Sequence, residues 1–421
     1  MANHEIGIPK DHEIESAAAV EMPTSPAAPA TTLFPILDSR PAGLARIAAE
    51  ATHAEDGHLI EFRSMRSKSL LNHSVSKRMG WKAWTINPYR GCEFGCKYCY
   101  ARYTHEFLRP EPIAPVEPGT YDAPQQDWAL AFEREIYLKE NAAWLLEQEL
   151  KSVPPDEELA LGTATDPYQP IERRVGITRS ILEVMARQQG RRMGIVTKSN
   201  LIVRDVDLLA RIAERNALVV HITVTTTDAA LARKLEPRAP RPDLRLAAVK
   251  TLREAGVITG VLCSPLLPGI NDSLRSLEQV ASAAAAAGAS FLGAHPLFLK
   301  SCSRPTYLSF VREHFPALVP DYERRYATKD FVDAGYRQRM ALLVRRLCAT
   351  HGLAERVTEA ILTRDPKEPG DPQSEGKKRY FTPRLPVDDP SMLSTTPTAD
   401  RKEPQKAVLE YPEPAQAALF G

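Results

Sequence analysis

Three cysteines in one short stretch are the residues of this sequence best suited to chemistry. Cys92, Cys96 and Cys99 stand in the string NPYRGCEFGCKYCYAR with the spacing C-x3-C-x2-C. Thiolates bind soft metal centres such as zinc, copper(I) and iron–sulfur clusters. A structural zinc site normally has four protein ligands, and His105 would complete such a set. A 4Fe–4S cluster held by three thiolates instead leaves one iron open to a small molecule.

The composition of the chain bears on which of these centres forms. The sequence begins MANHEIGIPK, without the apolar segment of a secretory signal, and no apolar run is long enough to span a bilayer. We therefore expect a cytoplasmic protein that does not contact a membrane. Thiols stay reduced in that compartment, which favours a metal centre over a disulfide framework.

The two ends of the chain differ from its middle. Residues 1–60 carry a net charge of −6 and residues 365–421 a net charge of −2, and together they hold 16 of the 35 prolines. We predict a disordered N-terminal segment over 1–60 and a disordered proline-rich tail over 365–421. One folded domain remains over 61–364, with its core at about 72–300 and helices after it. Its net charge of +9 reads either as an ordinary mixed-charge surface or as a bias toward a phosphate-bearing partner.

Within that domain, short apolar segments alternate with amphipathic helical patterns. The predicted strands are 83–87, 158–165, 193–199, 218–226, 258–266 and 290–298, and the predicted helices are 175–189, 205–215, 243–255 and 274–287. Such alternation predicts a parallel sheet with right-handed crossovers. We expect an α/β fold, a partial (βα)6 TIM-type barrel with a helical C-terminal extension over 307–351 and disordered ends. A ligand site would then lie at the carboxyl ends of the strands.

The cysteine loop resembles that of the radical S-adenosylmethionine superfamily, in which an aromatic residue precedes the third cysteine, as Tyr98 does here. Four more strings resemble the branch that contains spore photoproduct lyase and its bacterial relatives: GTATDPYQPIE, TKSNLIVRDVDLL, KLEPRAPRPDLRLAAVKTLREAG and SPLLPGIND. The resemblance covers residues 72–296, just over half of the chain.

This resemblance implies a mechanism. A 4Fe–4S cluster on the three cysteines would bind S-adenosylmethionine and cleave it reductively to a 5′-deoxyadenosyl radical, which abstracts hydrogen from a substrate. It also implies a low-potential electron donor of the flavodoxin or ferredoxin type and a site closed to water. The competing hypothesis is a non-catalytic iron–sulfur or zinc protein that acts as a redox sensor or binding module.

Polar residues at the predicted strand ends are candidates to bind the cofactor. Many family members carry Gly-Gly-Glu after the second strand, whereas this sequence has Thr163, Thr165 and Asp166. Asp166 either accepts the methionine ammonium or makes the turn before a proline. By resemblance, Lys198 meets the methionine carboxylate and Tyr98 lies near the adenine; the alternative for Lys198 is an exposed turn lysine.

The fourth predicted strand offers a further contact. Its alternation puts His221, Thr223 and Thr225 on one face. This pattern predicts that the two threonines reach the ribose of the cofactor. We expect His221 to be a buried histidine of the core and not a ligand.

A hydrogen-atom donor is harder to place. Spore photoproduct lyases carry an extra cysteine soon after the cluster loop, but this chain has none between Cys99 and Cys263. Cys263, late in the fifth predicted strand, either faces the lumen as a donor or is a small buried residue. Cys302 and Cys348 receive no role. The absence of the expected cysteine argues against thymine-dimer repair and leaves cofactor cleavage untouched.

Nucleic acid is the leading guess for the substrate. Basic residues that could contact phosphates cluster after the fourth predicted strand: Arg233, Lys234, Arg238, Arg241 and Arg245. A solvated mixed-charge surface is the alternative for these residues.

Overall fold

The computed structural model describes residues 43, 52–54, 60–76, 81–108 and 127–355. All of them belong to one compact unit, residues 41–421. The ends that we predict to be disordered lie outside the described residues, apart from a few positions in 1–60. The domain boundaries at 61 and 364 stay predictions.

Eight strands form the main sheet, in the order β12-β11-β10-β9-β8-β7-β4-β3. Neighbours from β4 to β12 are parallel, and β3 is antiparallel to β4. The strands are β3 (Leu71–Ser76), β4 (Trp81–Ile86), β7 (Glu158–Leu161), β8 (Arg192–Thr197), β9 (Ala217–Thr223), β10 (Ile258–Leu266), β11 (Phe291–Pro296) and β12 (Ala354–Glu355). The six predicted strands are all present as parallel neighbours, and the partial (βα)6 barrel is confirmed.

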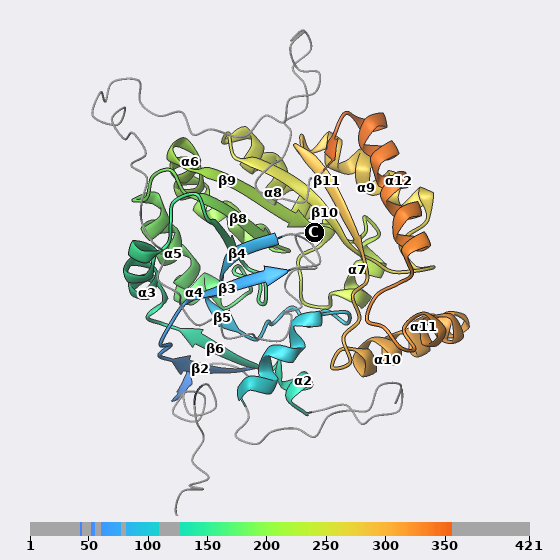
Figure 1. The fold of residues 1–421 in the computed structure, drawn as a ribbon. Coiled ribbons are helices and arrows are strands. Elements are labelled where there is room, and N and C mark those ends of the chain that lie inside the picture. Colours follow the sequence, from blue (N-terminus) through green and yellow to red (C-terminus); the bar gives the residue numbers. More distant parts are fainter. Residues whose placement is uncertain (1–42, 44–51, 55–59, 77–80, 109–126, 356–421) are drawn as a thin grey trace, which may run out of the picture. The chain divides into compact units, whose positions relative to one another are not determined.

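Helices connect these strands: α3 (Ala142–Glu149), α4 (Glu172–Val175), α5 (Ile177–Ala186), α6 (Val206–Arg215), α7 (Ala229–Leu235), α8 (Pro242–Glu254) and α9 (Leu274–Ala286), with the 3-10 segments η2 (Leu150–Ser152) and η3 (Asn200–Asp205). Helices α3, α5, α6, α8 and α9 follow one another around the outside of the curved sheet (Figure 1). The end of α7 packs with the cysteine loop. The predicted helix 175–189 is divided, because Gly176 at φ 65° caps α4 in the left-handed conformation.

The predicted C-terminal extension is also present. It consists of α10 (Arg304–His314), η4 (Pro316–Leu318), α11 (Val319–Arg325) and α12 (Ala334–His351). Residues of α10, α11 and α12, among them Tyr307 and Tyr322, share a hydrophobic cluster with Phe94 and Tyr98 of the cysteine loop. The extension therefore supports the loop rather than standing apart from it.

A second, smaller sheet was not predicted. Its order is β1-β2-β6-β5, made of β1 (Thr52–Ala54), β2 (Glu61–Met65), β6 (Glu135–Lys139) and β5 (Tyr89–Arg90). Strand β5 leads directly into the cysteine loop, and η1 (Tyr100–Leu108) and α2 (Asp127–Ala131) follow it. This sheet thus fixes the point at which the loop leaves the barrel.

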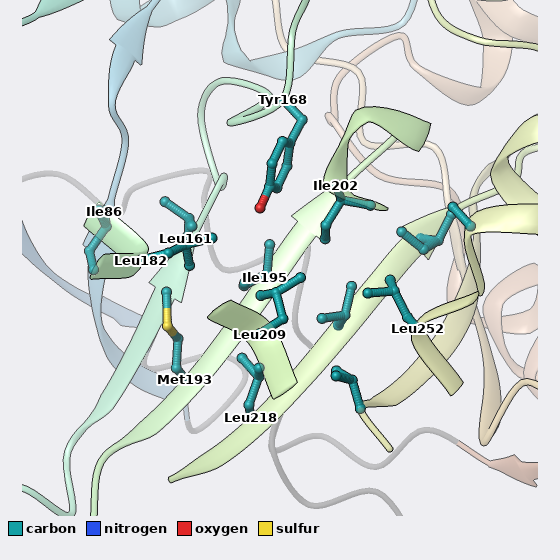
Figure 2. Packing of buried hydrophobic residues seen from close by; sticks show 14 of the residues in the cluster. Ile86, Leu161, Tyr168, Leu182, Met193, Ile195, Ile202, Leu209, Leu218 and Leu252 are labelled. Atoms are coloured by element: carbon teal, nitrogen blue, oxygen red, sulfur yellow. The ribbon is translucent and has the colours of Figure 1, made fainter. Parts of the chain in front are cut away.

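The main core fills the space between the barrel strands and the helices. Figure 2 shows Leu161, Met193, Ile195 and Leu218 of the strands packed with side chains of the helical layer, including Leu209. Burial of these side chains contributes the largest favourable free energy of folding. Among the described residues, no helix is both long and apolar enough to cross a membrane.

The opposite face of the strands turns into the barrel lumen. At one end of the lumen Phe291 packs with Val219 and Ile258 in a separate cluster. A Cβ atom on Gly260 would lie 2.5 Å from the Phe291 ring, so only glycine leaves room for it. This end of the lumen is filled, and any cavity must lie at the carboxyl ends of the strands.

Candidate functional site

The three cysteines lie together in a loop that follows β5. Cys92 and Cys96 are buried, Cys99 is partly exposed, and all three line one cavity. Burial raises the pKa of all three thiols above its ordinary value, that of Cys96 to about 12. Since soft metal centres bind thiolates, such a centre would release these protons on binding. The donor set, three thiols on one short loop beside a cavity, fits an iron–sulfur cluster with one open iron.

Backbone contacts hold this loop in place. The Cys92 amide donates to the Phe132 carbonyl (2.9 Å). The fully buried Arg102 donates to the carbonyls of Ala129 (2.7 Å) and Cys96 (3.3 Å) and pairs with Glu133 (3.0 Å). The loop therefore has a fixed shape set by residues outside it.

Gly91 is the position where the loop approaches its neighbour most closely. It adopts φ 85°, and a Cβ atom there would lie 2.6 Å from the Glu135 carbonyl oxygen. No other residue type fits this site without moving β6. The glycine next to the first cysteine is thus required by the second sheet.

The cavity lies where the barrel predicts it, at the carboxyl ends of the parallel strands. Its empty space, counted out to open solvent, is about 920 Å³. Beside the cysteines, the polar residues that line it come from strand ends and the loops after them: Thr163, Thr165, Asp166, Lys198, Thr223, Ser264 and His295. Apolar walls come from residues such as Phe132, Val196 and Leu262.

Asp166 makes the turn that the sequence offered as one alternative, and it also lines the cavity. Its Oδ1 accepts from the Tyr168 amide (2.9 Å) and the Thr197 hydroxyl (2.6 Å), and its Oδ2 accepts from the Lys198 amide (2.7 Å). Burial raises the pKa of Asp166, and these hydrogen bonds oppose that shift. A carboxylate has about four acceptor sites. Three are used within the protein, so one remains for a ligand in the cavity that Asp166 lines.

Lys198 brings a cation to the same wall. Its ammonium lies 5.7 Å from the centre of the Tyr98 ring, a cation–π distance. Burial disfavours its charge, but Cys96, Glu236 and Asp166 outweigh burial and raise the pKa of Lys198. The side chain is only partly exposed and lines the cavity, so it is not an exposed turn lysine.

The structure places three of the four predicted threonines on the cavity lining, and the Thr163 hydroxyl accepts from the Asn87 amide group (3.2 Å). Thr163 and Thr223 line the cavity, whereas the Thr165 hydroxyl, also on the lining, donates to the Gly91 carbonyl. Thr225 is not among the lining residues; its hydroxyl donates to Glu236. His221 is fully buried and its ring packs against Phe291 (5.1 Å), as expected of a core histidine.

Cys263 does not face the cavity. It is buried among the side chains between sheet and helices, and its thiol contacts the Thr225 carbonyl (3.5 Å). The alternation of β10 turns Leu262 and Ser264 inward and Cys263 outward. The geometry gives no support to a hydrogen-donor role here and fits the alternative of a small buried residue.

The arginines after β9 are largely engaged within the protein. Arg245 pairs with Glu236 (2.5 Å), Arg241 pairs with Asp243 (2.8 Å), and Arg238 donates to the Glu93 carbonyl. These contacts shape the cysteine loop and the start of α8. Arg245 is buried and cannot reach a phosphate, whereas Arg238 and Arg241 are 42% and 62% exposed, so phosphate contacts by this segment stay a prediction.

The zinc alternative loses its fourth ligand. The Nε2 atom of His105 bonds the Glu135 carbonyl oxygen (3.0 Å), and its ring packs edge-on against Phe132. Within the part of the chain that the structure describes, no three His, Cys, Asp or Glu side chains are grouped to hold a single metal ion. Cluster thiolates bind separate irons, so this spacing is no obstacle to a cluster.

Sequence reasoning missed a buried ion pair next to the loop. The Tyr98 hydroxyl donates to Glu236, which pairs with Arg245, and both charged side chains are at most 1% exposed. In the sequence, this ion pair is visible only as Glu236 and Arg245 of the string KLEPRAPRPDLRL, and both look like surface charges. Buried charges are rare unless they are paired.

The chain is similar in sequence to a known protein family and to proteins from other organisms. Residues 86–280 match the family model described as the radical SAM superfamily. The Mycobacterium bovis protein Mb2609c is 32% identical over 337 residues, which is 78% of this chain and 94% of that protein. The Methanocaldococcus jannaschii protein MJ0683 is 29% identical over 213 residues, 51% of this chain and 70% of that protein. Both relatives carry the description uncharacterised.

Two solved structures show a weaker likeness. Spore photoproduct lyase complexed with a dinucleoside spore photoproduct matches with a TM-score of 0.49 and 16% identity, over 69% of this chain and 79% of that chain. Streptococcus suis SuiB bound to S-adenosylmethionine matches with a TM-score of 0.38 and 13% identity, over 66% and 51%. These likenesses are too weak to bear on function.

Proposed function

Because the chain belongs to the radical SAM superfamily, we propose that Cys92, Cys96 and Cys99 hold a 4Fe–4S cluster and that the cavity beside them binds S-adenosylmethionine. One observation carries the proposal: three thiols, two of them on buried cysteines, line the same cavity as a carboxylate and an ammonium. Once reduced by an external electron donor, a cluster held by these cysteines would supply the one electron that splits S-adenosylmethionine into methionine and a 5′-deoxyadenosyl radical, the species that would take a hydrogen atom from the substrate.

Asp166 and Lys198 are matched to the amino-acid end of the cofactor. The Lys198 amide donates to the Asp166 carboxylate (2.7 Å). The negative Asp166 side chain and the positive Lys198 side chain therefore start from neighbouring positions on the cavity lining. A methionine group carries an ammonium and a carboxylate on one carbon. We assign the ammonium to Asp166 and the carboxylate to Lys198, since charge-assisted hydrogen bonds are the strong ones.

Apolar side chains and Tyr98 complete the cofactor pocket. The Tyr98 ring lines the cavity while its hydroxyl is held by Glu236, which leaves the ring for contact with the adenosine part. Thr163 and Thr223 offer polar contacts on the same lining. Phe132, Val196 and Leu262 exclude water, which protects a reactive radical from side reactions.

The test is anaerobic reconstitution of wild type and two cysteine variants. Cys96→Ala is expected to lose the iron–sulfur absorbance and all 5′-deoxyadenosine formation after reduction. Cys348→Ala is the matched control, because Cys348 is a buried cysteine whose thiol contacts the Leu292 carbonyl and which is not on the cavity lining. Zinc without iron in the wild type, or cleavage that survives in Cys96→Ala, would overturn the assignment.

An aromatic rim bears on the substrate. Phe298 and Tyr100 line the cavity, their ring centres 6.1 Å apart, and Phe298 stacks on Phe331 at 4.4 Å. Planar aromatic groups, including nucleobases, stack on such side chains. We take nucleic acid as the first substrate class to test. Binding to single-stranded and duplex DNA and to RNA should weaken with salt, and no binding at low salt would exclude nucleic acid.

A further inference from the structure

One segment after β9, residues 235–245, holds the cysteine loop from outside the barrel strands. The Lys97 amide donates to the Leu235 carbonyl (2.9 Å), and the Arg238 amide donates to the Phe94 carbonyl (3.3 Å). The Arg238 side chain donates to the Glu93 carbonyl. Three consecutive parts of the loop, between the first and third cysteines, are thus attached to this segment.

Glu236 is the centre of the attachment. Its Oε1 accepts from the Tyr98 hydroxyl and from Thr225, and its Oε2 pairs with Arg245 at 2.5 Å. Arg245 also donates to the carbonyls of Thr223 (3.1 Å) and Pro240 (2.7 Å). The ion pair therefore joins the cysteine loop, the end of β9 and the segment before α8 at one buried point.

Stability alone is a poor reason for such a pair. Removing two charges from water costs free energy that their attraction often only offsets, and apolar replacements of similar volume are frequently as stable. The ion pair does, however, fix the orientation of a neighbouring side chain. It fixes the hydroxyl end of Tyr98, so the ring of Tyr98 is held as a wall of the cavity, with the Lys198 ammonium 5.7 Å from its centre.

We propose that Glu236, itself fixed by Arg245, is a positioning residue that sets the Tyr98 ring for binding S-adenosylmethionine. The proposal rests on the proposed function, because it requires that the cavity takes this cofactor. Glu236 does not line the cavity and acts on its lining through the Tyr98 hydroxyl. Its effect should therefore appear in cofactor affinity and in the cluster's response to the cofactor, with the iron content unchanged.

The chain offers a matched control. Tyr89 also donates its hydroxyl to a buried glutamate, Glu172, which pairs with Arg204 at 2.7 Å. This second set has the same chemistry but does not line the cavity. Tyr98→Phe and Tyr89→Phe each remove one phenol hydroxyl from a buried carboxylate, and they differ in whether that hydroxyl orients a cavity wall.

The first experiment titrates S-adenosylmethionine into the reconstituted holoenzyme and records the EPR spectrum of the reduced cluster with and without it. We expect Tyr98→Phe to weaken binding about tenfold, the lower range for loss of an outer supporting partner at a metal site. Its EPR response to the cofactor should be reduced, while Tyr89→Phe should match wild type in both. Equal behaviour of the two variants would overturn the proposal.

Two double variants test the same point without leaving a lone charge in the core, which would be costly and could prevent folding. Glu236→Gln with Arg245→Met keeps an acceptor for the Tyr98 hydroxyl, and Glu236→Leu with Arg245→Met removes it; neither leaves a buried charge. The first pair should retain wild-type affinity and the second should weaken it about tenfold. Equal affinity in both pairs would refute the positioning role. If wild type itself bound no S-adenosylmethionine, the proposed function would fall first and this inference with it.

Discussion

Replacing Asp166 by asparagine is the sharpest test of the cofactor pocket. The substitution keeps Oδ1, which accepts from the Tyr168 amide and the Thr197 hydroxyl. It puts an NH2 group where Oδ2 accepted from the Lys198 amide at 2.7 Å, so two donors face each other. A buried donor without a partner costs about 1–3 kcal/mol, and we expect the free energy of unfolding to fall by about 2 kcal/mol.

The substitution should also weaken cofactor binding, by a free energy similar in size to the loss of stability. A hydrogen bond to a charged group contributes about 1.5–3 kcal/mol, and each 1.4 kcal/mol changes a dissociation constant about tenfold. Loss of the carboxylate that meets the methionine ammonium should therefore weaken S-adenosylmethionine binding roughly 10- to 100-fold. Equilibrium titration of the reconstituted enzyme measures this affinity, and urea unfolding measures the stability.

Asp205→Asn is the control for this substitution. Asp205 is fully buried, pairs with Arg179 (2.7 Å) and Arg204 (2.8 Å), and is not on the cavity lining. The same chemical change there should cost about 1–3 kcal/mol of stability, because both arginines are about a third exposed and keep a second carboxylate, and it should leave cofactor affinity unchanged. Wild-type affinity in Asp166→Asn, or an equal loss in Asp205→Asn, would contradict the assignment of Asp166.

Three more outcomes follow from the geometry. Lys198→Met should weaken S-adenosylmethionine binding about tenfold in the same titration, because one charge-assisted hydrogen bond is lost; unchanged affinity would remove Lys198 from the pocket. Gly260→Ala should lower the free energy of unfolding by about 1–3 kcal/mol through overpacking against Phe291, and Phe291→Leu in the same chain should recover part of that loss. Burial lowers the pKa of His105 to about 4 from an ordinary value of 6.5, so the unfolded chain takes up this proton first as the pH falls. Stability should fall between pH 6.5 and 4 by about 3 kcal/mol, and His105→Gln should lack this component in urea unfolding at pH 7 and 5.

The barrel could be predicted because its signals are local. Each strand of the parallel core is a short apolar run, and each helix after it carries its own apolar spacing, so alternation alone gives the order of elements. The position of the cavity followed from the same rule, since Lys198 directly follows β8 and Asp166 lies in the loop after β7. The cysteine spacing likewise named three candidate metal ligands, which the structure places on one cavity.

What could not be predicted depends on contacts between distant parts of the chain. The second sheet joins β2 to β6 over more than seventy residues, and no pattern in either strand names its partner. The arginines after β9 looked like a basic surface because a sequence does not show that Arg245 meets a buried Glu236. Thr225 shared the inward face of β9 with Thr223, yet its hydroxyl is taken by that same glutamate. Periodicity assigns a face to a side chain and leaves its partner open.

The two ends of the barrel lumen differ, and this difference predicts which residues select the substrate. Phe291 fills one end together with Val219 and Ile258, and Gly260 leaves no space beside its ring. A substrate must therefore approach from the cavity mouth, where Phe298 and the strand ends form the lining. Substitutions at the filled end should change stability with little effect on which substrate reacts. Changes at Phe298 should alter substrate preference while cofactor cleavage in the absence of substrate continues, since Phe298 lies on a different segment from the three cysteines and from Asp166.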